Sequence, residues 1–251
     1  MVDMPSITSI VSYMVLFLFG TLIGNFTTTI FHRLPRDIMI SGFDQKVTRP
    51  PFCSSCGHIL RFYEYLPILS WFSTFGKCNY CHIAITKSYI TLEILIGLLA
   101  MILYYILGQN LEYFFIYFCF ATLVILNIFI YSKHNIVPAK ITLSIIILGM
   151  IYRTLIDQEI TLWLTSFSLA AITSLWIIRK QLAAIAAAQE NTINVHALIH
   201  LILPASLWCE NYGMLAFATS MVIAWCLLSN KTANKLFYPI ELIALFFISL
   251  Y

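Results

Sequence analysis

Long apolar runs alternate with shorter polar segments along this chain of 251 residues. A helix needs roughly 20 predominantly apolar residues to cross the hydrocarbon core of a bilayer. Eight runs come close to this length, and we interpret each as a membrane-spanning helix. They cover residues 7–31, 88–108, 112–131, 136–152, 161–178, 194–208, 212–229 and 236–251. The pattern therefore predicts an all-α, polytopic membrane protein with about eight transmembrane helices.

The first apolar run also resembles a secretory signal peptide in its position. A signal peptide carries a basic region before its apolar run and a small-residue cleavage site after it. Residues 1–30 contain no Lys or Arg, and no such cleavage site is evident. We interpret this run as a retained transmembrane helix.

The composition supports the membrane interpretation, because 61% of the residues are hydrophobic and only 10% are charged. Soluble domains carry roughly 25% charged residues, so this chain has too little polar surface for an ordinary water-soluble globule. The net charge of +3 gives no indication of nucleic-acid binding.

The positions of Lys and Arg predict the topology, since these residues are enriched on the cytoplasmic side. Seven of them lie within residues 32–87, and thirteen of the 14 fit a topology in which this loop is cytoplasmic and both termini are outside. Only Arg153 falls on the other side. We therefore divide the chain into a first transmembrane helix (1–31), a cytoplasmic loop (32–87) and a transmembrane helical domain (88–251).

The polar loop contains two C-x-x-C pairs, formed by Cys53 with Cys56 and by Cys78 with Cys81, and 21 residues separate the pairs. Two such pairs can complete the tetrahedral four-sulfur site that is typical of structural zinc. A cytoplasmic loop is in a reducing compartment, which disfavours disulfides. Four free thiols or a redox pair are the alternatives. We predict a zinc ion, whose binding free energy would fold a loop that has little core of its own.

The sequence around these cysteines is similar to one family. The stretch from Cys53 to Trp71 reads C-S-S-C-G-H-I-L-R-F-Y-E-Y-L-P-I-L-S-W and resembles the pattern C-x-x-C-G-x-x-I-x-W-Y-D-N-I-P-x-L-S-W of the type IV prepilin leader peptidases, which also act as N-methyltransferases. The segment from Gly24 to Pro35 resembles the opening motif of the same family. The resemblance is dense over residues 20–100 and thinner afterwards.

The resemblance implies an intramembrane aspartic peptidase, in which two carboxylates share a proton and hold one water. This chain departs from that pattern. Tyr131 stands where the first catalytic Asp belongs, and the best placement of the second puts Asn194 there. Glu93 lies where the family also has Glu, so it does not replace a missing Asp. None of the four aspartates lies in a predicted span: they are Asp3, Asp37, Asp44 and Asp157.

Two other groups of residues have open interpretations. His196 and His200 are four residues apart on one predicted span and could share a helix face, but packing is favoured over metal binding because no acidic or thiolate partner is near. The aromatic run of residues 62–65 could contact a substrate peptide or pack the loop.

These observations predict a diverged prepilin peptidase homologue in the inner membrane that lacks aspartyl peptidase activity. It would bind prepilin or pseudopilin signal segments, or pilus or secretion assembly proteins. The alternative is an active leader peptidase and/or N-methyltransferase, and a third hypothesis is a structural membrane subunit. The resemblance alone implies S-adenosylmethionine, since no motif for that cofactor can be recognised in the sequence.

Overall fold

The computed structural model describes most of the N-terminal half of the chain and parts of the C-terminal half. The described residues are 7–38, 52–53, 55–108, 110–157, 195–209 and 233–250, with isolated positions between 165 and 179. They are helical outside the cysteine loop, so the prediction of an all-α protein is confirmed for this part of the chain. The chain divides into two compact units, Met1–Leu126 and Asn127–Tyr251.

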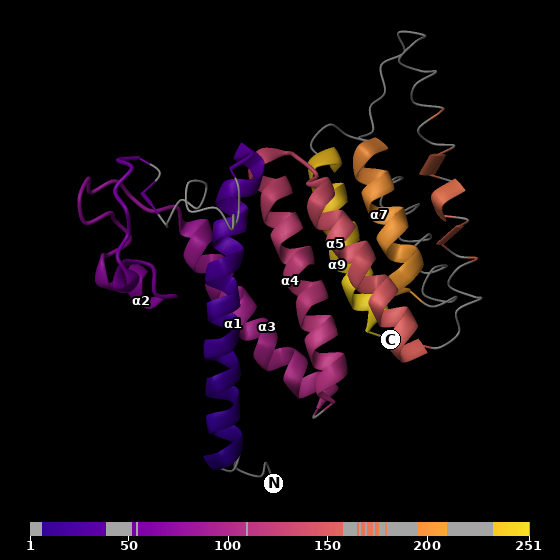
Figure 1. The fold of residues 1–251 in the computed structure, drawn as a ribbon, viewed down its shortest axis with the longest axis horizontal. Coiled ribbons are helices and arrows are strands. Elements are labelled where there is room, and N and C mark those ends of the chain that lie inside the picture. The colour runs from indigo at the N-terminus through magenta and orange to yellow at the C-terminus, as the bar shows by residue number, and fades with distance from the viewer. Residues whose placement is uncertain are drawn as a thin grey trace, which may run out of the picture. The chain divides into compact units, whose positions relative to one another are not determined.

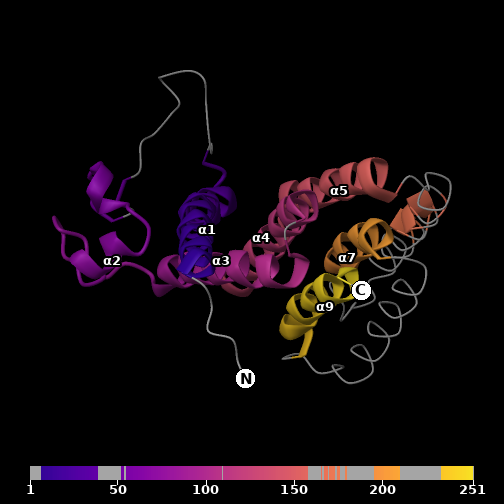
Figure 2. The same ribbon diagram turned by 90° about the horizontal axis from the view of Figure 1, so that it is seen from below.

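Two long helices dominate the first unit and lie against each other (Figures 1 and 2). They are α1 (Ile7–Arg33) and α3 (Lys87–Leu107). The described part of the intervening loop contains three short helical turns: η1 (Leu34–Arg36), η2 (Phe62–Glu64) and α2 (Leu69–Ser73). The following helix α4 (Leu111–His134) begins in this unit.

Glycines allow the backbones of α1 and α3 to approach closely. A Cβ atom at Gly24 would lie 2.7 Å from Cα of Glu93. A Cβ atom at Gly20 would lie 2.6 Å from the carbonyl oxygen of Ile96, and Gly97 on α3 is similarly crowded by α1. Small residues four apart are a common device for close helix packing in membranes, where van der Waals contact replaces the hydrophobic effect.

Three helices in the described ranges are long and apolar enough to cross a membrane, namely α1, α3 and α4. They coincide with the first three spans predicted from the sequence. The other described helices are shorter: α5 (Ala139–Tyr152), α7 (Val195–Trp208) and α9 (Ala233–Ser249). They overlap the predicted spans 136–152, 194–208 and 236–251. The predicted span 161–178 is described only at isolated positions, and 212–229 lies outside the described residues.

In the second unit α7 packs against both α5 and α9 (Figure 2). The indole N–H of Trp208 donates to the carbonyl oxygen of Ile145 at 3.1 Å. A Cβ atom at Gly149 would lie 2.8 Å from the same indole nitrogen. A glycine on α5 therefore makes room for the large side chain at the end of α7.

Arg153, the basic residue that does not fit the predicted topology, caps a helix. It lies in the π-helical turn η3 (Arg153–Asp157) that continues α5, and it is buried. Its Nε donates to the carbonyl oxygen of Leu207 at 2.7 Å, and a terminal nitrogen donates to that of Cys209 at 3.0 Å. The last carbonyls of a helix lack intrahelical partners. A structural requirement at the end of α7 thus explains the position of this charge.

We expect Gly24→Leu to separate α1 from α3, because the added side chain would meet the α3 backbone. Overpacking a close contact typically costs about 1–3 kcal/mol, so the thermal unfolding temperature in detergent should fall. Leu22→Ala is the matched control, since Leu22 lies on the same helix and is exposed. Equal unfolding temperatures for the two variants would contradict the glycine packing.

Candidate functional site

The structure brings together the four cysteines that the sequence indicated. The Sγ atoms of Cys53, Cys56, Cys78 and Cys81 all lie within 4.8 Å of one another, and those of Cys53 and Cys81 are 3.8 Å apart. In a tetrahedral site with Zn–S bonds of about 2.3 Å, the sulfur atoms are about 3.8 Å apart. The cluster could therefore hold a metal ion such as zinc.

The first cysteine pair lies on a tight knuckle closed by an antiparallel bridge between Phe52 and Ile59. The backbone N–H of Cys53 donates to the carbonyl oxygen of His58 at 2.8 Å, and the N–H of Gly57 donates to that of Cys53 at 2.9 Å. Gly57 has φ +71°, a conformation that costs glycine little. The turn points both thiols of the pair toward the same space.

The second pair repeats this arrangement. Lys77 and Ala84 form the closing bridge, the N–H of Cys78 donates to Ile83 at 3.0 Å, and the N–H of His82 donates to Cys78 at 3.0 Å. His82 has φ +55°, in the position that glycine holds in the first knuckle. Two knuckles of the same design thus supply two sulfur atoms each.

The pKa values of the Cys53 and Cys81 thiols are shifted in opposite directions. Burial raises the pKa of the Cys53 thiol, but hydrogen bonds from the backbone N–H groups of Cys56 and Ser55 outweigh it and bring that pKa down to about 7. The N–H of Ile83 lowers the pKa of Cys81, yet burial and the neighbouring thiols raise it to about 11. A bound metal ion deprotonates coordinating thiols, so this donor set fits a divalent metal.

Side chains of the two membrane helices hold the stretch between the knuckles. The Oε2 atom of Glu93, a buried residue on α3, accepts a hydrogen bond from the backbone N–H of Ile68 at 2.7 Å. Ile68 has φ +59°, which is unusual for a β-branched residue. The amide nitrogen of Asn25 on α1 donates to the carbonyl oxygen of Tyr65. The sequence analysis missed this anchoring role of Glu93, although a lone acid in an apolar span was a signal for it.

A glycine fixes the entry to the second knuckle. A Cβ atom at Gly76 would lie 2.8 Å from the indole ring of Trp71, and Gly76 has φ +67°. The indole nitrogen of Trp71 forms no hydrogen bond within the part of the chain that the structure describes. It lines a cavity, so an acceptor group in that cavity would satisfy it.

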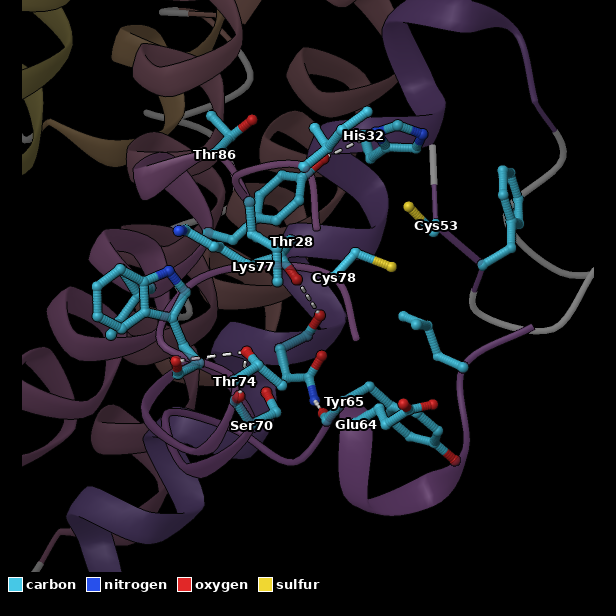
Figure 3. Close-up of a pocket in the computed structure, with 18 of the residues that line it drawn as sticks. Thr28, His32, Cys53, Glu64, Tyr65, Ser70, Thr74, Lys77, Cys78 and Thr86 are labelled. Atoms are coloured by element: carbon cyan, nitrogen blue, oxygen red, sulfur yellow. Dashed lines mark hydrogen bonds between the residues drawn. The ribbon is translucent and has the colours of Figure 1, made fainter. Parts of the chain in front are cut away.

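This cavity has a volume of about 200 Å³ and lies between the loop and the ends of α1 and α3 (Figure 3). Its lining includes the charged or polar side chains of Asn25, His32, Arg33, Glu64, Lys77 and Glu93. Figure 3 shows the hydrogen bond between Nδ1 of His32 and the hydroxyl oxygen of Tyr89, which are 2.8 Å apart. The mixture of charges and apolar walls suits a peptide side chain or another small polar group.

Glu64 connects the two knuckles at the edge of this cavity. One of its oxygens accepts from the N–H of Arg61 at 2.8 Å and the other from the amide of Asn79 at 3.1 Å. The hydrogen bond from Arg61 is the main reason that the pKa of Glu64 is lowered. In the neighbouring aromatic run, Phe62 and Tyr63 are exposed, so their side chains do not pack the loop interior.

The sequence analysis expects Tyr131 and Asn194 at the positions of the family aspartates, and the structure describes only the first of them. Tyr131 on α4 is buried, with an exposed fraction of 3%, and its ring centroid lies 4.7 Å from that of Tyr238 on α9. Asn194 lies outside the described residues, as does the side chain of His196.

Further polar groups are buried in the same unit as Tyr131. The amide of Asn127 and the hydroxyls of Thr142 and Tyr238 form no hydrogen bond among the residues that are described. Glu241 follows Tyr238 by three residues on α9 and has an exposed fraction of 1%. The sequence analysis did not single out Glu241, although a buried acid in an apolar segment is a recognisable functional signal.

Residues 18–107 match the family described as Bacterial Peptidase A24 N-terminal domain. Among curated proteins, the chain is similar to the prepilin leader peptidase/N-methyltransferase of Myxococcus xanthus (strain DK1622), with 36% identity over 34% of this chain and 23% of that protein. The protein of the same name from Vibrio cholerae is 28% identical over 56% of each chain. That from Dichelobacter nodosus is 33% identical over 39% of this chain and 34% of its own.

The chain thus spans between about a quarter and about half of the length of these relatives. No solved structure matches the chain.

We expect the purified protein to contain about one zinc ion per chain, since a closed four-sulfur site binds one. Cys81→Ser should remove most of the metal and lower the unfolding temperature of the loop. Cys119→Ser is the control, because Cys119 lies on α4, outside the four-cysteine cluster. Metal analysis of reduced protein prepared without chelators provides the measurement, and absence of zinc there would refute the assignment.

A second prediction concerns the anchor on α3. Glu93→Leu leaves the N–H of Ile68 without an acceptor, which typically costs about 1–3 kcal/mol, whereas Glu93→Gln keeps an acceptor oxygen. Limited proteolysis of the zinc-loaded full chain should therefore cut the loop faster in Glu93→Leu than in Glu93→Gln. Equal cleavage rates would mean that this hydrogen bond does not hold the loop.

Proposed function

We propose that this chain, whose residues 18–107 match the Bacterial Peptidase A24 N-terminal domain, is a prepilin peptidase-like protein of a type IV pilus or type II secretion-type system. It binds prepilin or pseudopilin signal segments, or assembly proteins, without cleaving by an aspartyl dyad. It resides in the inner membrane with the cysteine loop in the cytoplasm and both termini outside.

The observation that carries the proposal is the environment of Tyr131. This residue matches the position of the first family aspartate, and it is buried against the ring of Tyr238. A phenol cannot supply a carboxylate base near neutral pH. The chain has only four aspartates in total, and none of them matches either catalytic position.

The substrate-binding part of the proposal is supported by where the similarity lies. Residues 18–107 contain α1, the described loop and α3, and these elements surround the cavity of about 200 Å³. A cavity of this size with charged and apolar walls fits one or two side chains of a peptide. We place the contact with prepilin segments here.

The cysteine loop has a structural role in this proposal. Cys53, Cys56, Cys78 and Cys81 would hold a zinc ion in a closed site with no open coordination position, as structural sites do. Binding of the metal would stabilise the loop and thereby the wall of the cavity. Removal of the metal should then weaken peptide binding indirectly.

One observation favours the alternative of an active enzyme. Glu241 is a buried carboxylate in the unit that contains Tyr131, and it lies one helical turn from Tyr238. Buried acids in membrane proteins are frequently functional. N-methyltransferase activity with S-adenosylmethionine is suggested only by the names of the relatives.

We expect no mature pilin when this chain is co-expressed with a prepilin in cells that lack other such peptidases. A catalytic unit loses most of its rate when one member is missing, so Tyr131→Asp alone should restore nothing. Mass spectrometry of the prepilin N-terminus measures cleavage and methylation. The intact prepilin should nevertheless co-purify with this chain.

Two outcomes would change the conclusion. The control is Glu112→Gln, because Glu112 is an exposed acid in the first turn of α4. Mature pilin that disappears in Glu241→Gln but persists in Glu112→Gln would identify an active enzyme with Glu241 as its acid. If the prepilin is neither cleaved nor co-purified with this chain, the third hypothesis, a structural membrane subunit, is the one that remains.

A further inference from the structure

The stretch of residues 66–75, which joins the two cysteine knuckles and contains α2, has two chemically different faces. Ser70, Trp71 and Thr74 line the cavity. The hydroxyl of Thr74 donates to the carbonyl oxygen of Ser70 at 2.8 Å. This face therefore belongs to the site already described.

The opposite face is apolar and uncovered. Leu69, Phe72 and Phe75 do not line the cavity, and their exposed fractions are 66%, 59% and 88%. They recur every third residue along the chain: Leu69 and Phe72 lie on α2, and Phe75 follows it by two residues. Clustered large apolar side chains on a surface usually mark an interaction site.

Anchoring hydrogen bonds place this stretch well inside the length of the membrane helices. Asn25, which binds the carbonyl of Tyr65, lies eight residues before the end of α1, or about 12 Å at 1.5 Å per residue. Glu93, which binds the N–H of Ile68, lies six residues after the start of α3, or about 9 Å. In Figure 1, α2 is level with the middle turns of α1 and not with its C-terminal end.

The ends of these helices mark the membrane surface. Arg36 in η1 directly follows α1 and Lys87 begins α3, and both side chains are exposed; such long basic side chains lie at the interface with the head groups. A segment about 10 Å inward from that level is at the depth of the acyl chains, not of the water.

The backbone of the stretch is suited to this environment, because it satisfies many of its own polar groups. The N–H of Ser70 donates to the carbonyl oxygen of Leu66 at 3.1 Å, and that of Phe72 donates to Ile68 at 3.2 Å. Exposed backbone without such partners is not tolerated in lipid.

We propose that residues 66–75 form a membrane-immersed segment of the loop, whose Leu69, Phe72 and Phe75 side chains contact the acyl chains of the adjacent leaflet. On α1, at a comparable depth, the apolar side chains of Leu22 and Phe26 are likewise exposed, by 58% and 57%. Lipid is the occupant that matches both the depth and the composition. The proposal is independent of any peptidase or prepilin-binding activity.

The test uses the unmodified full chain in phosphatidylcholine vesicles. One sample contains a phospholipid with a diazirine on its acyl chain, and a second is exposed to hydroxyl radicals in the water phase; mass spectrometry maps both kinds of modification. Leu22 is the internal control for lipid contact, and Ile59, which is 58% exposed on the first knuckle, is the control for water contact.

We expect Leu69, Phe72 and Phe75 to react with the lipid probe about as strongly as Leu22 and several-fold more than Ile59, and to resist radical oxidation. Oxidation like that of Ile59, without lipid labelling, would place the segment in water and overturn the proposal. Protection from both reagents would mean that protein covers the face, which also overturns it.

Discussion

A carboxylate two turns inside a membrane helix needs a hydrogen-bond donor, because an unpaired polar group is costly in an apolar medium. Here the donor is the backbone N–H of Ile68, whose nitrogen lies 2.7 Å from Oε2 of Glu93. The glycines at positions 20, 24 and 97 bring α1 and α3 together, so that Asn25 on the neighbouring helix can hold Tyr65 in the same stretch. The path of the loop between its two knuckles follows from these two anchors.

The cysteine cluster compensates for the small hydrophobic core of the loop. A segment of this length buries little apolar surface, and its knuckles are closed by single bridges instead of strands. Four thiols lie within 4.8 Å of one another. They would stabilise the folded loop strongly only with a bound cation, because the free energy of metal binding then adds to the free energy of folding. Asn25 and Glu93 on the membrane helices and two of the four cysteines all line the cavity. These groups hold the loop in one conformation, so that the loop can form a wall of the cavity although it has little core of its own.

The similarity to prepilin peptidases is concentrated where this architecture lies, in residues 18–107. The second unit holds a different kind of centre. Tyr131 packs on Tyr238, and Asn127 adds a buried amide without hydrogen-bond partners among the described residues. The position that the resemblance assigns to the first family aspartate is therefore packed against an aromatic ring, and Glu241 is a buried carboxylate in the same unit.

The sequence by itself determined which segments are apolar helices and which four cysteines come together, since hydrophobic run length and C-x-x-C spacing are local properties of the chain. Three long apolar helices and the joint cluster of four thiols agree with those predictions. Only the tertiary structure assigned Glu93 to the N–H of Ile68, Arg153 to the end of α7, and Leu69 to an exposed face. These roles depend on contacts between residues that are far apart in the sequence, and no local sequence pattern specifies such contacts.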